Sequence, residues 1–267
     1  MKAKEKYEKL KLYLQELGSV AIGFSGGVDS SFLLTVAKQV LGDKAIAITV
    51  QSVFNPMSEI KFAQKFAQEL NITHVILKVD VLNIANVADN PSNRCYYCKQ
   101  GIFTLLKAEA AKRGIREVLD GSNLDDLGDY RPGMKALEEL AIKSPLRFAG
   151  LTKKDIRELS QKLGIVTWNK PSAACLASRI PYGEVLTEEK LARIEAAEEF
   201  LARYGCRQLR VRCHNNLARI EVSQEDFIKI LDPGTCREIV EYLSKLGFVY
   251  TTLDLQGYRM GSFNEVL

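Results

Sequence analysis

The feature of this sequence that most constrains its fold is the alternation of strand-like and helix-like segments over the first two-thirds of the chain. Short apolar, β-rich runs such as SVAIGF and KAIAITV are separated by longer segments with helical patterning. The expected strands are 19–24, 44–50, 73–79 and 117–121, and the expected helices are 30–42, 58–70, 95–113 and 153–164. This alternation predicts an α/β fold, a doubly wound parallel sheet with helices on both faces.

The pattern changes near residues 180–185. The expected elements there are a long helix at 187–204, strands at 208–214 and 218–222, two short helices, and a last strand at 248–255. This order predicts a small C-terminal α+β domain. We therefore expect a larger domain over residues 1–183 and a smaller one over 184–267.

Composition and charge narrow the class of protein. The 267 residues include 46% hydrophobic and 26% charged residues, as in ordinary globular proteins. No apolar run is long enough to span a bilayer, and the charged start MKAKEKYEKLKLYLQELG lacks the apolar core of a secretory signal. We therefore expect a cytoplasmic protein without a membrane partner. The net charge of +4 comes without a basic block, so no nucleic-acid partner is expected.

A glycine-rich turn, GFSGGVDSS, joins the first strand to the following helix. Gly26 and Gly27 permit a tight path and a close approach of phosphate oxygens, because neither carries a Cβ atom. Ser25 and Ser30 add hydroxyl donors near the start of the helix. Asp29 would be unusual in a pure anion site, and its carboxylate indicates a Mg²⁺ ion bridging it to phosphates.

This turn lacks the spacing and the lysine of a Walker loop and matches the SGGxDS loop of the ATP pyrophosphatase (PP-loop) superfamily. The resemblance implies that ATP is cleaved between its α- and β-phosphates, that AMP is transferred to a substrate oxygen, and that the loop holds the departing pyrophosphate. The alternative is a glycine-rich turn without a ligand.

A second segment, DGSNLDDLGDYRPG, follows a later strand and resembles the second block of amide-forming and sulfur-transferring PP-loop enzymes. The ends of parallel strands share one rim of a sheet, so this segment is expected beside the first turn. Asp125, Asp126 and Asp129 are candidate Mg²⁺ ligands, and Arg131 is a candidate to neutralise a phosphate. The alternative is a solvated acidic loop.

The chain has six cysteines and no secretory signal, which favours reduced thiols or metal ligands over disulfides. Cys95 and Cys98 would share one face of a helix, and Cys175 follows near the end of the larger domain. Three thiolates are one too few for a closed Cys₄ zinc site, unless His74 or His214 supplies a fourth ligand. They suit an iron–sulfur cubane in which one iron keeps an open position. Three buried thiols without metal are the alternative.

Four stretches make nearly the whole chain similar to the LarE family of sulfur transferases: DGSNLDDLGDYRPGMKA, WNKPSAACLASRIPYG, LRVRCHNNLARIEV and TLDLQGYRMGSFN. The resemblance implies a role in making the nickel-pincer nucleotide cofactor of lactate racemase. The implied substrate is pyridinium-3,5-biscarboxylic acid mononucleotide, whose carboxylates are adenylated by ATP and converted to thiocarboxylates. The resemblance also implies a homohexamer.

The family has two sulfur sources. Some members give up the sulfur of their own cysteine and act once, and these lack the upstream cysteine pair. Others carry three cysteines, bind a [4Fe–4S] cluster and pass on sulfide from it. This sequence resembles the second group, because it has Cys95, Cys98 and Cys175. The sequence does not identify the donor that would replace the sulfide. In the alternative, membership of the first group, Cys175 would be a sacrificial sulfur donor.

The substrate also carries a nucleotide phosphate. Strand alternation puts Arg210 and Arg212 on one face, where they could form a fork for a phosphate, although a solvated strand face is the alternative. Ser178 and Arg179 are further candidates, and Cys175, Asp29 and Ser178 make up the expected catalytic set. Three carboxylates could bind metal or pair with these arginines: Glu198, Glu221 and Asp254. The remaining cysteines are expected in the core: Cys206, Cys213 and Cys236.

Two other functions compete with sulfur transfer to a small molecule. A tRNA 2-thiolation enzyme can combine a PP-loop with three cysteines, but it should also show basic and aromatic RNA-binding surfaces. The weak net charge speaks against it. A non-enzymatic adenine-nucleotide sensor would not need Asp29 or the acidic loop.

Overall fold

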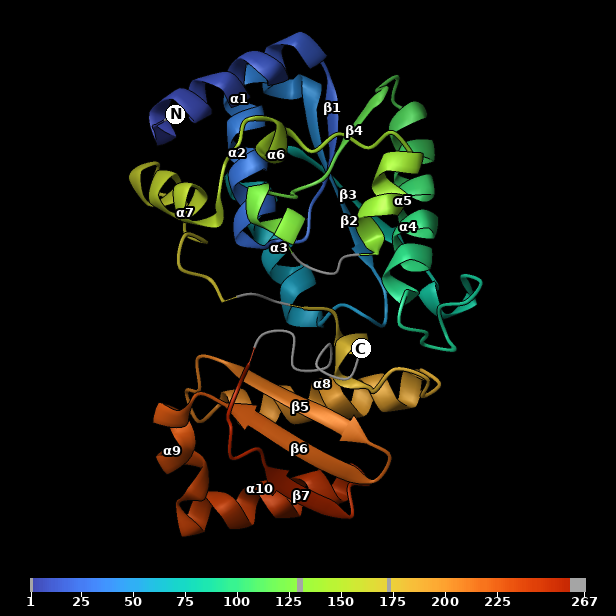
Figure 1. Ribbon diagram of the computed structural model, residues 1–267, viewed down its shortest axis with the longest axis vertical. Helices are drawn as coiled ribbons and strands as arrows, with labels where there is room; N and C mark the ends of the chain where they lie inside the picture. Colours follow the sequence, from blue (N-terminus) through green and yellow to red (C-terminus); the bar gives the residue numbers. More distant parts are fainter. Residues whose placement is uncertain (1, 129–131, 172–173, 260–267) are drawn as a thin grey trace. The chain divides into compact units, whose positions relative to one another are not determined.

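The computed structural model describes residues 2–128, 132–171 and 174–259 (Figure 1). Contacts divide the chain into two compact units. Unit 1 comprises Met1–Ala85 and Asn93–Ala173, and unit 2 comprises Asn86–Ser92 and Ala174–Leu267. No helix in these described ranges is both long and apolar enough to cross a membrane.

Unit 1 is built on a four-stranded sheet in the order β3-β2-β1-β4. The strands are β1 (Val20–Gly23), β2 (Ala45–Gln51), β3 (Thr73–Lys78) and β4 (Glu117–Leu119). All neighbouring strands in it are parallel, and Val20 of β1 pairs with Ala45 on one side and Glu117 on the other. The predicted parallel α/β sheet is confirmed.

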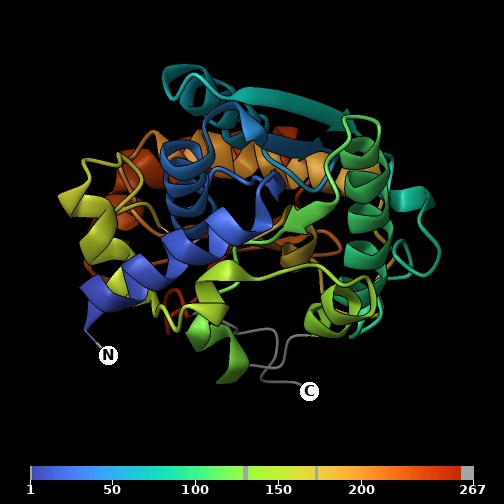
Figure 2. The same ribbon diagram turned by 90° about the horizontal axis from the view of Figure 1, so that it is seen from above.

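Helices cover both faces of this sheet, as Figures 1 and 2 show for α2 and α4. The helices are α1 (Ala3–Leu17), α2 (Val28–Leu41), α3 (Met57–Glu69), α4 (Arg94–Ala111), α5 (Gly133–Glu139), α6 (Pro145–Phe148) and α7 (Lys153–Lys162). Alternation along β1 distributes its side chains between two cores. Val20 and Ile22 pack with residues of α1, α2, α3 and α7, whereas Ala21 packs with residues of α4 and α5.

Unit 2 is an α+β unit, as the sequence predicts. Its elements are α8 (Glu188–Ala202), β5 (Leu209–His214), β6 (Leu217–Val222), α9 (Phe227–Leu231), α10 (Pro233–Lys245) and β7 (Tyr250–Leu253). β5 and β6 form an antiparallel hairpin, and β7 adds in parallel to β6. The hairpin turns through Asn215, whose φ of 52° is left-handed, a conformation that asparagine tolerates and two-residue hairpin turns require.

In the described residues, 3₁₀ turns connect or extend these elements: η1 (Gly42–Lys44), η2 (Val81–Asn83), η3 (Leu124–Gly128), η4 (Leu176–Arg179) and η5 (Gln224–Asp226). The division between units differs from the predicted boundary after residue 183, since unit 2 already begins at Ala174 and includes Asn86–Ser92. Hydrogen bonds explain this assignment. Asn90 donates to the Pro181 carbonyl oxygen at 2.7 Å and accepts from the Gly183 N–H at 2.9 Å.

Candidate functional site

The glycine-rich turn lies between β1 and α2. Gly26 has a left-handed φ of 73°, and a Cβ atom there would come within 3.2 Å of the Phe62 ring. Gly27 caps α2 in an extended conformation without a side-chain hydrogen bond. The N–H groups of a helix's first turn have no partner within the helix, so this turn offers backbone donors to an anion.

The hydroxyl groups of the turn are close to each other. The Oγ atoms of Ser25 and Ser30 are 3.1 Å apart, and Ser30 also donates to the Gly27 carbonyl oxygen at 3.3 Å. Gly121, just after β4, lies against this first turn, because a Cβ atom on it would be 3.2 Å from the Ser30 nitrogen. The turn and the segment after β4 therefore meet at one edge of the sheet, as the strand order predicts.

Asp29 is the second residue of α2, and its carboxylate is partly buried, with the side chain 22% exposed. One oxygen accepts a hydrogen bond from the Lys153 ammonium group. The other, Oδ1, is buried without a hydrogen-bond partner among the described residues. Burial raises the pKa of Asp29, and the neighbouring Lys153 opposes that rise. A buried carboxylate oxygen without a partner is costly, and a divalent cation would satisfy it. This arrangement fits ATP with Mg²⁺.

Sequence reasoning missed Lys153. It is the first residue of α7, a helix that starts at a capping box in which the Thr152 side chain accepts from the Asp155 N–H. The Lys153 N–H donates to the Asp125 carboxylate at 2.8 Å, which anchors the base of its side chain. A lysine in the first turn opposes the helix dipole, and that mismatch is the sequence signal that could have identified it.

Two aspartates of the acidic segment after β4 accept hydrogen bonds from backbone N–H groups, and their predicted role as Mg²⁺ ligands stays a prediction. Asp126 accepts from the Asn123 N–H at 2.9 Å, and Asp125 accepts from Lys153 as described, so both carboxylates hold backbone turns. The predicted ligands Asp129 and Arg131 lie outside the described residues. Within the part of the chain that the structure describes, no three His, Cys, Asp or Glu side chains gather to hold a metal ion.

Asp120, at the end of β4, was not singled out from the sequence. Its buried carboxylate accepts hydrogen bonds from the hydroxyl groups of Ser122 and Ser144, the latter at 2.5 Å. These bonds join the segment after β4 to the residues before α6. Asp120 therefore supports the backbone that brings Gly121 against Ser30.

The cysteine pair opens α4 in unit 1. Cys95 and Cys98 lie in its first two turns and are partly exposed. Their spacing places both on one face, as predicted. The Arg94 guanidinium lies 4.0 Å from the Cys95 sulfur. A nearby cation favours a thiolate, the form of cysteine that binds iron.

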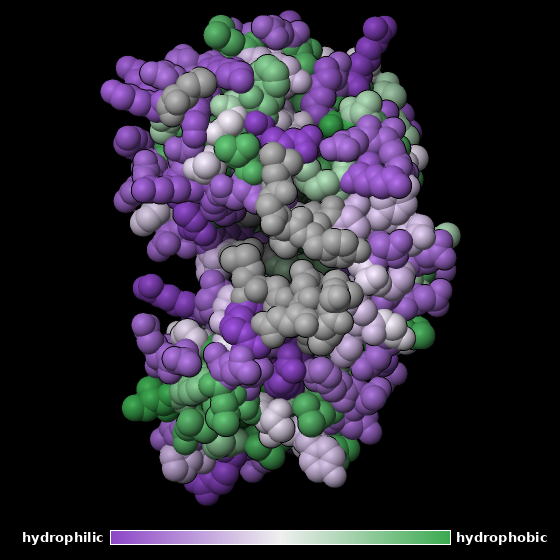
Figure 3. Space-filling model, viewed as in Figure 1, coloured by the Kyte–Doolittle hydropathy of each residue, from purple (hydrophilic) through white to green (hydrophobic). Residues whose placement is uncertain are grey.

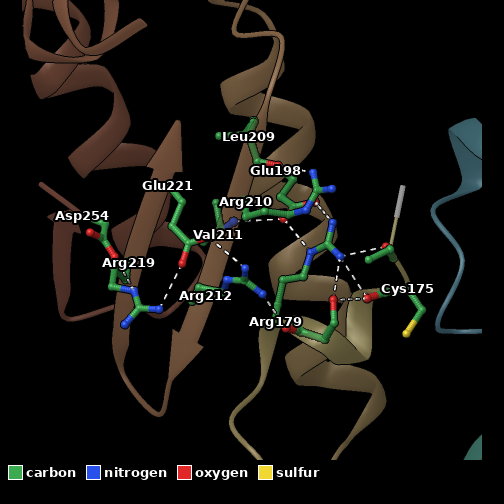
Figure 4. Close-up of polar contacts among 12 residues, drawn as sticks. Cys175, Arg179, Glu198, Leu209, Arg210, Val211, Arg212, Arg219, Glu221 and Asp254 are labelled. Carbon is green, nitrogen blue, oxygen red and sulfur yellow. Dashed lines mark hydrogen bonds and ion pairs between the residues drawn. The ribbon is translucent and has the colours of Figure 1, made fainter. Parts of the chain in front are cut away.

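Cys175 precedes η4 in unit 2, and its backbone is held firmly. Its carbonyl oxygen accepts from the Ser178 hydroxyl at 2.8 Å and from Arg179 Nη1 at 3.0 Å. Figure 4 shows this carbonyl facing the arginine while the sulfur points away from it. Arg179 also donates to the Ala174 carbonyl oxygen at 2.7 Å, so the described residues around Cys175 are fixed by a single guanidinium group.

Arg179 is in turn fixed by Glu198 of α8. Its Nε and Nη2 atoms donate to the two oxygens of that carboxylate at 2.9 and 3.0 Å. Glu198 accepts a third hydrogen bond, from the Val211 N–H of β5 at 2.9 Å. These contacts make Arg179 a support for the Cys175 backbone, and its predicted phosphate-binding role stays a prediction.

Arg210 and Arg212 lie on β5 and are buried, so the alternative of a solvated strand face is wrong. Arg212 donates to the Ser178 carbonyl oxygen at 2.6 Å and to Glu221 at 2.9 Å. The Arg210 guanidinium carbon lies over the Tyr258 ring, 5.2 Å from its centroid. Burial and the positive charge of Arg179 lower the pKa of Arg210.

Four arginines and three carboxylates form a network of polar contacts among the described residues of unit 2 (Figure 4). Arg219 joins the network by contacting Glu221 at 3.0 Å and Asp254 at 3.4 Å. The cluster consists of Arg179, Arg210, Arg212, Arg219, Glu198, Glu221 and Asp254, four positive and three negative charges. Guanidinium groups held at fixed positions in this way are suited to binding an anion. Of the other cysteines in unit 2, Cys213 is buried in the core, whereas Cys206 and Cys236 are partly exposed.

Comparison with known proteins agrees with this architecture. Residues 3–118 match the NAD synthase family. An uncharacterized protein of Synechocystis sp. is 42% identical over 98% of this chain and 98% of its own length. Pyridinium-3,5-bisthiocarboxylic acid mononucleotide synthase of Lactiplantibacillus plantarum is 38% identical over 95% of this chain and 92% of its own length. An uncharacterized protein of Methanocaldococcus jannaschii is 32% identical over 96% of this chain and 98% of its own length.

Proposed function

Since the chain belongs to the LarE family, that of pyridinium-3,5-bisthiocarboxylic acid mononucleotide synthase, we propose that it is an ATP-dependent sulfur transferase. The proposed substrate is pyridinium-3,5-biscarboxylic acid mononucleotide, and its carboxylates become thiocarboxylates on the way to a nickel-pincer nucleotide. The observation that carries the ATP-dependent part is the buried Asp29 oxygen without a partner, beside the backbone donors of the glycine-rich turn.

Adenylation solves a chemical problem of this reaction. A carboxylate reacts poorly with a nucleophile because oxide would have to leave. Attack of a carboxylate oxygen on the α-phosphorus of ATP forms an acyl adenylate and releases pyrophosphate. The turn's N–H groups, Ser25 and Ser30 would hold that pyrophosphate, and Lys153 would add positive charge. Mg²⁺ held by Asp29 would supply further positive charge.

Sulfur transfer completes the proposed reaction. A sulfide nucleophile bonds to the acyl carbon, the bond from that carbon to the AMP oxygen breaks, and AMP leaves with the electron pair. We propose that Cys95, Cys98 and Cys175 hold a [4Fe–4S] cluster, which would supply the sulfide. Three thiolate donors and the arginine beside Cys95 support this assignment. The donor that replaces the sulfide is a separate, unknown partner.

The arginine cluster of unit 2 is the proposed site for the substrate's nucleotide phosphate. Arg210 and Arg212 are the proposed ligands, supported by their burial on one face of β5 and by the lowered pKa of Arg210. An anion there would relieve the repulsion between Arg210 and Arg179. Ser178, bonded to the Cys175 carbonyl, would hold the Cys175 backbone in position during sulfur transfer.

We further propose a cytoplasmic homohexamer that does not bind nucleic acid. The exposed apolar surface of unit 2 supports self-association. Figure 3 shows an apolar patch over α9, a helix on which Ile228 and Leu231 are 79% and 56% exposed.

Pyrophosphate release tests the adenylation step. The wild-type protein should release pyrophosphate only with ATP, Mg²⁺ and the dicarboxylate substrate together. Asp29→Asn should lower the rate by about 100-fold or more, because it removes the proposed Mg²⁺ ligand. Asp43→Asn is the control, because Asp43 is exposed and pairs only with Lys38 among the described contacts. Equal rates for the two variants would refute the role of Asp29.

Anaerobic purification tests the sulfur source. Iron and labile sulfide near four atoms each per chain, with an unchanged polypeptide mass after turnover, support the cluster. Cys95→Ser and Cys98→Ser should each lower the iron content, whereas Cys236→Ser should not. Absence of iron after anaerobic reconstitution would refute the cluster. Loss of the elements of H₂S from Cys175 during turnover would instead identify that cysteine as a sacrificial donor.

A further inference from the structure

Lys170 lies in the segment that follows α7 in unit 1, five positions before Cys175 in the sequence. Both the backbone N–H and the backbone carbonyl of Lys170 are hydrogen bonded. The Lys170 N–H donates to the Thr167 carbonyl oxygen at 2.9 Å, and its own carbonyl oxygen accepts from Arg157 at 3.0 Å. Arg157 also donates to the Trp168 carbonyl oxygen at 2.7 Å. α7 therefore holds the base of the Lys170 side chain.

The Lys170 ammonium group makes three contacts far away in the sequence. It donates to the Glu59 carboxylate at 2.6 Å and to the Gly26 carbonyl oxygen at 3.1 Å. It also lies 3.8 Å from the centroid of the Phe62 ring. The side chain is only 19% exposed, so these contacts are partly shielded from water. Glu59 and Phe62 of α3 thus hold a cation directly on the carbonyl of the glycine-rich turn.

The contact with Gly26 has a consequence for the next peptide group. No peptide bond in the described part of the chain is cis, so the C=O of Gly26 and the N–H of Gly27 point in opposite directions. Holding the carbonyl on Lys170 therefore directs the Gly27 N–H to the other side of the turn. A glycine pair permits this peptide to flip, and a flipped peptide would present its oxygen where an anion is to bind.

We propose that Lys170 is a positioning residue of the glycine-rich turn: it fixes the Gly26–Gly27 peptide so that its N–H, and not its oxygen, faces the bound phosphates. The Phe62 ring occupies the space beside Gly26 that a side chain would need, which explains why a glycine stands at this position. This inference rests on the proposed use of ATP and adds a residue that does not itself touch the nucleotide.

The test compares Lys170→Met with Lys6→Met in the full-length protein. Lys6 is a matched control, because it forms an ion pair with Asp155 in unit 1 at the same 2.6 Å and is 17% exposed, but contacts α7 instead of the turn. Calorimetry would measure the binding of Mg-ATP and of inorganic pyrophosphate. Lys170→Met should weaken both by about tenfold. Lys6→Met should change both by less than about twofold, and Lys170→Arg should recover most of the loss, because a guanidinium group can also pair with a carboxylate and lie over an aromatic ring.

A second measurement separates positioning from general stability. In the absence of nucleotide, amide hydrogen exchange over residues 23–31 should be faster in Lys170→Met and unchanged in Lys6→Met, even where both variants melt at similarly lowered temperatures. If Lys170→Met does not fold, Glu59→Gln provides the same test with a smaller expected effect.

The outcomes distinguish this inference from the proposed function. Wild-type affinity in Lys170→Met, or equal losses in Lys170→Met and Lys6→Met, would overturn the positioning role and leave the use of ATP intact. A wild-type protein that binds neither Mg-ATP nor pyrophosphate would refute the proposed function itself.

Discussion

Replacing Glu198 by alanine should destabilise unit 2 more than almost any other change to a polar side chain there. The Glu198 carboxylate accepts three hydrogen bonds, two from Arg179 and one from the Val211 N–H. The paired side chains are 3% and 15% exposed for Arg179 and Glu198, respectively. Water therefore cannot readily replace the lost carboxylate, and the guanidinium group would stay buried without its acid.

Breaking a buried ion pair by removing one partner costs about 3–5 kcal/mol of folding free energy. Arg179 would keep its hydrogen bonds to the carbonyl oxygens of Ala174 and Cys175, which favours the lower end of this range. For a unit of the size of unit 2, Asn86–Ser92 and Ala174–Leu267, a loss of about 3 kcal/mol corresponds to a fall of roughly 12–24 °C in the melting temperature of that unit.

Thermal and urea unfolding of the full-length protein, followed by circular dichroism, would measure this loss. Hydrogen exchange at residues 209–214 reports on unit 2 separately, because the two units need not unfold together. Glu199→Ala is the control, since Glu199 is the exposed neighbour of Glu198 on the same helix and should change stability by less than about 0.5 kcal/mol. A loss below about 1 kcal/mol in Glu198→Ala, or equal losses in both variants, would refute this reasoning.

Two further predictions concern unit 1. Gly121→Ala should weaken Mg-ATP binding by about tenfold, measured by calorimetry, because the new Cβ atom would lie 3.2 Å from the Ser30 nitrogen and push on the first turn of α2. The control is Gly114→Ala, which is strained by a left-handed φ of 71° but whose Cβ atom would meet nothing within 4 Å, so it should lower stability and leave the affinity unchanged. Burial lowers the pKa of His74 from its ordinary 6.5, so the unfolded chain takes up the proton first as the pH falls. The contribution of His74 to the free energy of unfolding should therefore be complete above about pH 6.5 and decline below it. In urea unfolding between about pH 7.5 and 5, His74→Gln should reduce this decline of the free energy of unfolding with falling pH. A pH dependence equal to that of the wild type would contradict this assignment.

Local patterns in the sequence were sufficient to predict most of the elements. The strand expected at 19–24 is β1, and the helix expected at 30–42 is α2, which begins two residues earlier because Gly27 ends the extended turn. These predictions succeed because apolar periodicity and glycine act over a few residues. The later helices are less regular: α9 is short as expected, whereas α10 extends over Pro233–Lys245.

By itself, the sequence determined the parallel α/β class, the glycine-rich turn with Asp29, the shared face of Cys95 and Cys98, and a second α+β unit. These features depend on residues that are neighbours along the chain. Only the tertiary structure identified the lysines, because Lys153 meets Asp29 across 124 positions and Lys170 meets Gly26 across 144. It also showed that Arg179 supports the Cys175 backbone through Glu198. A charged side chain looks the same in sequence whether it is solvated or paired, and packing between distant segments decides which of the two it is.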